Sequence, residues 1–359
     1  MFPRICIALL LGGLAAFVSA CSNAGNRTAL PSFSAQESSA SAAHARRGVK
    51  IREFPDLPQT SSSGYFPLGI ASGPDNSLWV IDDIDLDFGQ GAVIEIATTG
   101  KLRHAYYYPG TSSGAAFVDI TVGPDGALWM TDDNNEQIIR LTTKGVYSKF
   151  PLDVSPISIA TGPDKAIWFT GQSLTGVGYE VGRLTTKGHV TIYPLSQQTW
   201  DIAAGPDGAL WFTEIYGPPG IGRITTSGKI TEYTSGITGV PESIAAGPDG
   251  AVWFTEDASG GGRIGRITTS GSVTEYSHGI SPMENPNGIA PGPDGAMWFT
   301  ETRRPYAAAK IGRISMQGKI NEYSRGLNSQ SGPSDITAGP DGRMWFVETK
   351  ADETGRLTI

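Results

Sequence analysis

A short turn motif recurs along the chain and constrains its fold more than any other feature. The triplet Gly-Pro-Asp occurs seven times, and a tryptophan follows each copy at a fixed offset. In the full motif, Gly-Pro-Asp-Gly, proline sets φ for a turn, aspartate bonds nearby backbone, and the last glycine allows a positive φ. The triplets begin at Gly73, Gly123, Gly162, Gly205, Gly247, Gly292 and Gly339, and the tryptophans are Trp79, Trp129, Trp168, Trp211, Trp253, Trp298 and Trp345. The chain therefore contains seven copies of one unit.

The copy at residues 243–276 predicts four short strands joined by tight turns. Its segments Ala251–Glu256 and Ile264–Thr268 are rich in β-branched and aromatic residues and are bounded by glycines. The copies start between 39 residues (Gly123 to Gly162) and 50 residues (Gly73 to Gly123) apart and show no helical periodicity. Such spacing is typical of four-stranded propeller blades. We expect an all-β fold, a seven-bladed β-propeller over residues 49–359.

The two ends of the repeat region predict how the ring closes. The last copy stops after its third strand, Thr354–Ile359, and lacks a fourth. Residues Val49–Phe54 match the fourth-strand pattern of Lys229–Tyr233. We expect the N-terminal strand to pair with Gly355–Thr358, complete the last blade and remove the open sheet edges.

The N-terminal residues predict secretion and a lipid anchor. Residues 1–20 hold one basic residue and then a short apolar run, which is typical of a signal peptide. The box Val18-Ser19-Ala20-Cys21 resembles the bacterial lipobox, in which the cysteine is lipidated; ordinary cleavage near Ala20 is the alternative. Residues 21–48 are rich in Ser and Ala and predict a flexible tether. We expect a lipoprotein of the bacterial cell envelope, periplasmic or on the outer surface.

The acidic character of the chain limits the kinds of partner that we expect it to bind. The chain has 35 acidic and 27 basic residues, a net charge of -8 and a pI near 5.1. Nucleic-acid binding needs clustered Lys and Arg, so we do not expect this protein to bind nucleic acid. We expect a monomer that meets the membrane only through its lipid and takes a small molecule or peptide at the channel mouth. Arginines recur in the third strand, where we expect blade packing or an ion pair with the second-strand Glu: Arg183, Arg223, Arg266, Arg313 and Arg356.

The sequence GPDGALWFTE followed by IGRITTSGKITEY, within Gly205–Tyr233, resembles the repeat of the streptogramin B lyases, also called virginiamycin B lyases. The likeness covers nearly the whole domain and lies mostly in residues that form the fold. It implies a seven-bladed propeller that opens a cyclic depsipeptide antibiotic at its ester by elimination, with a histidine base and Mg²⁺.

The residues that the resemblance would assign to catalysis are only partly present. The family's Glu-Pro-His signature reads Gly332-Pro333-Ser334 here, and its second histidine aligns with Asn287 in Asn285-Pro286-Asn287-Gly288. Glu348 matches the family's other metal-binding glutamate. The remaining histidines of the repeats fall in or beside predicted outer strands: His104, His189 and His278. Whether the protein is an enzyme is therefore left open.

One position per blade, two residues before the recurrent first-strand isoleucine, is expected to line the channel mouth. It is apolar in blades 1 to 4 and polar in blades 5 to 7: Leu68, Val118, Ile157, Trp200, Glu242, Asn287 and Ser334. This switch predicts a one-sided, off-axis pocket over blades 4 to 7, with Trp200, Glu242, Asn285, Asn287 and Ser334 as ligand-binding residues. The alternative is that these residues only cap the first strands.

A second ring is expected where the second strands end. Six of its seven members are acids: Asp82, Asp132, Gly171, Glu214, Glu256, Glu301 and Glu348. Oxygen ligands of this kind suit Mg²⁺ or Ca²⁺, and Glu256, Glu301 and Glu348 are the candidate metal ligands. The alternative is that each acid bonds backbone or an arginine within its own blade.

These features together predict a lipid-anchored propeller that binds a small molecule or cyclic ester at the channel mouth. Two alternatives remain open: a metal-dependent lyase or lactonase-type hydrolase acting on a cyclic ester, and a non-catalytic interaction scaffold.

Overall fold

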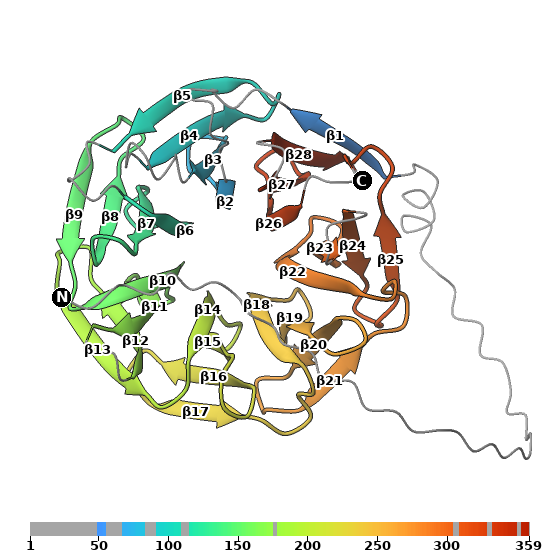
Figure 1. Ribbon diagram of the computed structural model, residues 1–359. Coiled ribbons are helices and arrows are strands. Elements are labelled where there is room, and N and C mark those ends of the chain that lie inside the picture. The colour runs from blue at the N-terminus through green and yellow to red at the C-terminus, as the bar shows by residue number, and fades with distance from the viewer. Residues whose placement is uncertain are drawn as a thin grey trace, which may run out of the picture. The chain divides into compact units, whose positions relative to one another are not determined.

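The computed structural model describes residues 49–54, 67–82, 91–108, 115–174, 178–303, 309–328, 332–349 and 353–358. The predicted signal peptide, the tether and Cys21 lie outside these residues. Seven antiparallel four-stranded sheets form a ring around a central channel (Figure 1). The predicted seven-bladed β-propeller is confirmed. Among the described residues, no helix has the length and apolar character needed to cross a membrane.

Each blade runs from an inner first strand to an outer fourth strand (Figure 1). Blade 1 consists of β2 (Pro67–Ser72), β3 (Ser77–Asp82), β4 (Ala92–Ala97) and β5 (Leu102–Tyr107). Blade 2 consists of β6 (Phe117–Val122), β7 (Leu128–Asp132), β8 (Gln137–Leu141) and β9 (Tyr147–Pro151). Blade 3 consists of β10 (Val154–Thr161), β11 (Ile167–Ser173), β12 (Tyr179–Leu184) and β13 (Val190–Leu195). Blade 4 consists of β14 (Thr199–Ala204), β15 (Ala209–Glu214), β16 (Gly220–Thr225) and β17 (Ile230–Tyr233). Blade 5 consists of β18 (Val240–Ala246), β19 (Val252–Asp257), β20 (Arg263–Ile267) and β21 (Val273–Tyr276). Blade 6 consists of β22 (Glu284–Pro291), β23 (Met297–Arg303), β24 (Lys310–Ile314) and β25 (Ile320–Tyr323).

Blade 7 joins the two ends of the repeat region. It contains β26 (Pro333–Ala338), β27 (Met344–Glu348), β28 (Glu353–Thr358) and β1 (Lys50–Phe54). Strand β1 pairs antiparallel with β28, from Lys50 opposite Thr358 to Phe54 opposite Thr354. The Phe54 ring stacks on Trp345 with centroids 5.5 Å apart, so β1 also contributes to the core. The predicted closure by the N-terminal strand is confirmed.

The Gly-Pro-Asp turn packs against its tryptophan in the same way from blade to blade. In blade 5 Gly250 has φ of 75°, the positive value expected from the motif. A Cβ on Gly247 would lie 2.3 Å from the Trp253 ring, so only glycine fits there. Asp249 accepts a hydrogen bond from Trp253 Nε1 at 3.0 Å and another from Arg266 Nε at 2.7 Å. The turn thus fixes the indole that fills the blade.

Third-strand arginines pair with the aspartate of the turn and lie over the repeat tryptophan, so the predicted blade packing is confirmed and the alternative, an ion pair with the second-strand glutamate, is wrong for four of the five predicted arginines: Arg183, Arg223, Arg266 and Arg313. Arg266 lies over the Trp253 ring with Cζ 5.8 Å from its centroid. Equivalent pairs are Arg140 with Asp125, Arg183 with Asp164, Arg223 with Asp207 and Arg313 with Asp294. The physical reason is reach: arginine and tryptophan are directly opposite in the sheet, close to the turn, whereas the glutamate lies at the far end of the second strand.

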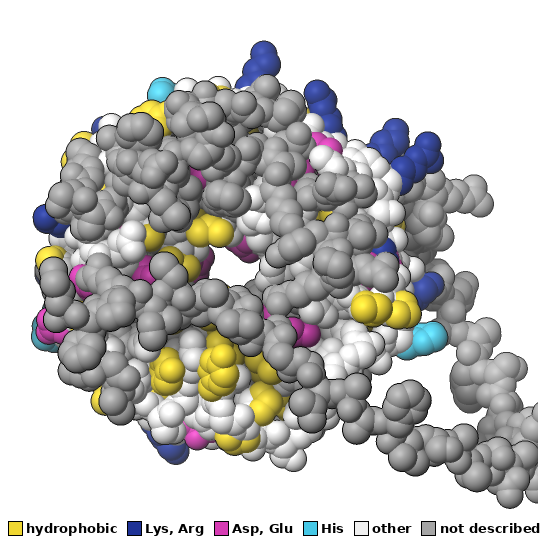
Figure 2. Space-filling view, viewed as in Figure 1, with side chains coloured by type: hydrophobic (Ala, Val, Ile, Leu, Met, Phe, Trp, Pro, Cys, Tyr) yellow, Lys and Arg dark blue, Asp and Glu magenta, His cyan; other side chains and the backbone are white. Residues whose placement is uncertain are grey.

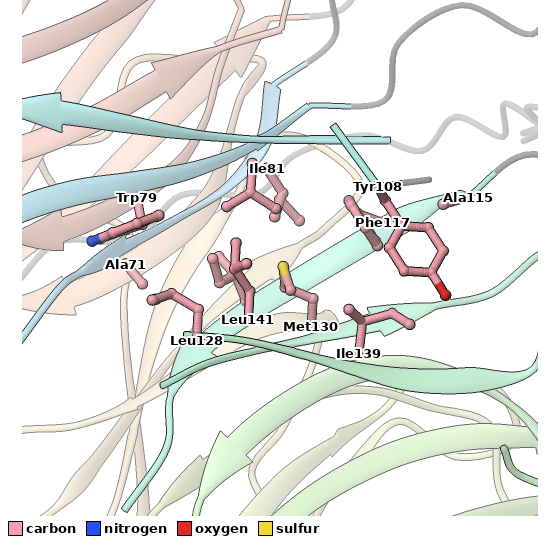
Figure 3. Packing of buried hydrophobic residues seen from close by; sticks show 12 residues of the cluster. Ala71, Trp79, Ile81, Tyr108, Ala115, Phe117, Leu128, Met130, Ile139 and Leu141 are labelled. Carbon is pink, nitrogen blue, oxygen red and sulfur yellow. The ribbon is translucent and has the colours of Figure 1, made fainter. Parts of the chain in front are cut away.

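The core consists of layers between neighbouring blades. Figure 3 shows the layer between blades 1 and 2, where Trp79 of β3 and Phe117 of β6 pack with Leu128 and Met130 of β7. Second strands such as β15 are buried at every residue because blades cover both of their faces. Their continuous apolar runs fit this environment.

Candidate functional site

A cavity of about 220 Å³ lies in the channel, at the end where the first strands begin. Figure 2 shows the opening at the centre of the ring. First strands of all seven blades line the cavity: Leu68, Val118, Asp119, Ile157, Ser158, Trp200, Asp201, Ser243, Asn287, Gly288, Ser334 and Asp335. The cavity is therefore central, and the predicted off-axis position over blades 4 to 7 is not observed.

The cavity lining combines apolar and polar side chains. Leu68, Val118, Ile157 and Trp200 come from blades 1 to 4 and Asn287 and Ser334 from blades 6 and 7, but blades 2 to 4 also contribute polar residues, so the lining is not divided into an apolar and a polar half. The Trp200 side chain is 42% exposed, unlike the seven buried repeat tryptophans. An aromatic face beside polar groups is a common composition for small-molecule pockets.

Three aspartates also line the cavity, and sequence reasoning missed them. Each directly precedes the recurrent isoleucine of its first strand, in blades 2, 4 and 7. Each also accepts a hydrogen bond from a backbone N–H of the next blade: Asp119 Oδ2 from Ile159 at 2.9 Å, Asp201 Oδ2 from Ile244 at 2.8 Å and Asp335 Oδ2 from Ile70 at 2.9 Å. The aspartates therefore join blades, and the signal that could have revealed them is the repeated Asp-Ile pair.

Ser158 connects two of these aspartates. Its Oγ lies 2.7 Å from Asp119 Oδ2 and 2.8 Å from Asp201 Oδ1. A serine hydroxyl has one hydrogen to donate, so both short contacts are hydrogen bonds only if one of the two carboxyl groups carries a proton. Burial and the nearby Asp201 raise the pKa of Asp119 to about 6 despite its hydrogen bonds. The Asp119–Ser158–Asp201 unit is thus suited to hold one proton.

Asp335 has the same electrostatic character on the other side of the channel. Burial and the neighbouring Asp119 raise its pKa to about 7, against the opposing effect of the hydrogen bond from Ile70. Three carboxyl groups in one narrow channel repel one another when ionised. Proton uptake relieves this repulsion.

The three candidate metal ligands lie outside the cavity lining. Glu256, Glu301 and Glu348 lie in the last part of their second strands with fully buried side chains. Burial and Glu275 raise the pKa of Glu256 to about 7, and burial and Glu322 raise that of Glu301 to about 9. Within the described part of the chain, no three His, Cys, Asp or Glu residues form a group that could hold a metal ion.

The other predicted residues are placed as follows. Glu242 and Asn285 are not among the residues that line the cavity. The carbonyl of Glu242 accepts a hydrogen bond from Thr213 Oγ1 at 3.0 Å, and Asn285 pairs with Thr302 between β22 and β23. His104 lies in the outer strand β5 and bonds Glu95 at 3.0 Å, far from the channel.

Comparisons with known proteins found one matching family model and several similar solved structures. The Virginiamycin B lyase family model matches residues 49–278 and, in an overlapping match, residues 110–359. A solved streptogramin B lyase structure is 31% identical, with a TM-score of 0.71, and the alignment covers 86% of this chain and 97% of that one. The structure of a catalytically inactive histidine variant of virginiamycin B lyase from Staphylococcus aureus with quinupristin is 32% identical, with a TM-score of 0.72, covering 87% of this chain and 100% of that one. No curated protein sequence matches.

Proposed function

Since the chain belongs to the virginiamycin B lyase family, we propose that its channel cavity binds a small molecule, and specifically a cyclic ester. The observation that carries the proposal is that the partly exposed aromatic ring of Trp200 lines the same cavity as the polar Asn287 and Ser334. Ser334 Oγ is buried and has no hydrogen-bond partner among the described residues. A buried hydroxyl of this kind gains free energy from a ligand that supplies the missing hydrogen bond.

The cavity volume limits what enters it. Small-molecule pockets usually enclose about 300–1,000 Å³, and this cavity has about 220 Å³. It therefore accommodates one side group or a small ring. The remainder of a larger cyclic ester would lie across the mouth, against exposed residues such as Trp200.

Binding without lyase-type elimination is the form of the function that we favour. Ser334 and Asn287 stand where the family resemblance expects histidines, and loss of a general base typically lowers a rate about a hundredfold to ten-thousandfold. The resemblance also implies Mg²⁺, but the donor set here does not fit that ion. Glu348 is the one family ligand that matches, and Gly332-Pro333-Ser334 offers no carboxylate or imidazole.

Quinupristin is the probe for this proposal, because it accompanies the related S. aureus protein. Isothermal titration of the purified propeller should show saturable binding that Trp200→Ala weakens. Chromatography and mass spectrometry should recover intact quinupristin. Rapid conversion to an isomer of equal mass would mean elimination and contradict the proposal, and absence of binding would favour an interaction scaffold.

A second candidate, hydrolysis or elimination of a cyclic ester with a carboxylate as base, is favoured by the Asp119–Ser158–Asp201 unit. A carboxylate that shares one proton can accept another from an attacking water while its partner stays protonated. A lactone panel assayed with chelator tests this candidate. Products heavier by one water, lost in Asp201→Asn, would support hydrolysis, and an unchanged panel would leave binding as the function.

We further propose a lipid anchor at Cys21, which rests on the box Val18-Ser19-Ala20-Cys21. The Cys21→Ala variant should leave the membrane fraction of the bacterial host and appear as soluble protein. Metabolic labelling with a fatty-acid analogue gives a second readout. Unchanged fractionation together with unlabelled wild-type protein would argue for ordinary signal-peptide cleavage.

A further inference from the structure

One third-strand position carries a cationic side chain in two neighbouring blades and a glycine in the blade before them. The position lies directly opposite the buried glutamate in the last part of the second strand. It is Lys310 in blade 6, Arg263 in blade 5 and Gly220 in blade 4. Blade 4 therefore lacks a cation at a position where the next two blades have one.

The cation in blade 6 is bound by acidic side chains. Lys310 Nζ lies 2.7 Å from Glu322 Oε2 and 3.6 Å from Glu284 Oε1. In blade 5, Arg263 Nε lies 3.7 Å from Glu275 Oε2. Positive charge at this place therefore offsets carboxylates of the first and fourth strands.

Blade 4 has carboxylates on its second and fourth strands without this positive charge. Glu214 is fully buried, and neither of its carboxyl oxygens has a hydrogen-bond partner among the described residues. Burial and the exposed Glu232 of the fourth strand raise the pKa of Glu214 to about 7. An unpaired buried carboxyl group is costly unless it is protonated or meets a cation.

The space beside Gly220 is narrow and is bordered by two oxygen atoms and one methyl group. A Cβ added at Gly220 would lie 2.7 Å from Glu214 Oε2, 3.1 Å from the carbonyl oxygen of Tyr233 and 3.3 Å from Thr234 Cγ2. Thr199 lies directly opposite Glu214 on the first strand, and its buried Oγ1 also has no partner in the described part of the chain. Blades 5 and 6 have Pro241 and Pro286 at the position of Thr199. Blade 4, which lacks the cationic side chain, thus has a side-chain oxygen atom at a position where blades 5 and 6 have proline.

We propose that blade 4 binds a calcium ion in this space, with Glu214, Thr199 Oγ1 and the Tyr233 carbonyl as ligands and Glu232 on the solvent side. Two carboxylates balance a divalent charge, and the neutral oxygens complete a set of hard donors. Ca²⁺ is favoured over Mg²⁺ because it accepts six to eight oxygens in irregular arrangements, whereas Mg²⁺ demands a near-ideal octahedron. The site is separate from the channel cavity and does not depend on the proposed ligand.

The test is calcium binding by the mature propeller after removal of metal with chelator. Isothermal titration with CaCl₂ should show one site per chain, and Ca²⁺ should raise the Tm because it binds the folded state. Glu214→Gln should weaken the affinity by at least about tenfold, since even loss of an outer contact to a metal ligand has that effect. Gly220→Lys supplies a tethered ammonium group as in blade 6 and should abolish both responses.

The matched control is Glu275→Gln in blade 5, which removes one acidic group at the position equivalent to Glu232 but beside Arg263. It should leave the calcium titration unchanged. Circular dichroism shows whether each variant is folded, and Gly220 has no positive φ that would forbid a side chain. No calcium binding by the wild type, or undiminished binding in both Glu214→Gln and Gly220→Lys, would overturn the proposal and leave Glu214 as a protonated buried acid.

Discussion

The two ends of each first strand differ in how strictly they repeat. At the turn end, the same aspartate, tryptophan and arginine contacts recur, and the Arg–Asp distance stays between 2.6 and 2.7 Å in blades 2 to 6. At the mouth end, the seven equivalent residues range from Leu68 to Trp200 to Ser334. Repetition thus accompanies the contacts that build every blade, and departures from repetition accompany the cavity. Substitutions at the turn end and at the mouth end should therefore differ in their effect on the free energy of unfolding.

The largest effect is expected from Trp253→Ala at the turn end. The side chain is fully buried, stacks on Tyr276 with centroids 5.7 Å apart and bonds Asp249. Truncation leaves a cavity and removes one of the hydrogen bonds to Asp249, so the free energy of unfolding should fall by about 3–5 kcal/mol. Urea unfolding followed by circular dichroism measures this loss. A cost near zero would show that the repeated indole is dispensable.

How well the sequence predicts the structure depends on whether a feature is visible in a short stretch of residues. The spacing of Gly-Pro-Asp and Trp is enough to predict seven blades, and the truncated last copy is enough to predict pairing of β1 with β28. The mouth position two residues before the isoleucine also locates cavity residues correctly in six blades, Glu242 being the exception. These features are local, so the sequence displays them directly.

The repeated Asp-Ile pair marks the three aspartates in the sequence, but whether their side chains face the channel depends on backbone irregularity. Strict alternation in a strand would place Asp201 and Trp200 on opposite sides. Each first strand instead has a bulge, such as the register shift between Thr199 and Ile202. A bulge turns two consecutive residues toward one side. No residue type in these strands marks the bulge, so only the structure shows that Asp119, Asp201 and Asp335 face the channel.

A smaller effect, dependent on pH, is expected from Asp335→Asn. The folded-state pKa of Asp335 is raised from 3.8 to about 7, so the folded protein binds more protons than the unfolded chain between these values. Its stabilising contribution is present at low pH and is lost as the pH rises from about 4 to about 7. The variant should flatten this slope by on the order of 1 kcal/mol per pH unit.

Asparagine has one acceptor oxygen, so Asp335→Asn also loses one of the hydrogen bonds from Ile70 and Ile336 at every pH. The slope is therefore the informative quantity, measured by urea unfolding at several pH values. The same measurement on Asp249→Asn is the control, because hydrogen bonds from Trp253 and Arg266 outweigh burial and lower the pKa of Asp249. An unchanged slope in Asp335→Asn would contradict the assignment.

A still smaller effect is expected from Arg266→Met at the turn end. Methionine keeps an apolar chain over Trp253 and removes only the partly exposed ion pair with Asp249. Such pairs contribute about 0–1 kcal/mol and are screened by salt. Unfolding at low and high salt should show a small cost that shrinks with salt. A loss as large as that of Trp253→Ala would mean that the ion pair, and not the indole, holds the turn.

The smallest change in stability is expected from Trp200→Ala at the mouth. The ring is 42% exposed and lies outside the interblade core clusters, so the free energy of unfolding should change by about 0.5 kcal/mol or less. Binding of quinupristin should weaken, because the aromatic wall of the cavity is lost. Trp200→Ala removes an indole at the mouth, in the first strand of blade 4, and Trp253→Ala removes one beside the turn, in the second strand of blade 5. Stability should respond only to the second, and binding by the folded protein chiefly to the first. A stability loss at Trp200 comparable to that at Trp253 would show that the mouth residue is structural and remove the strongest support for a ligand site.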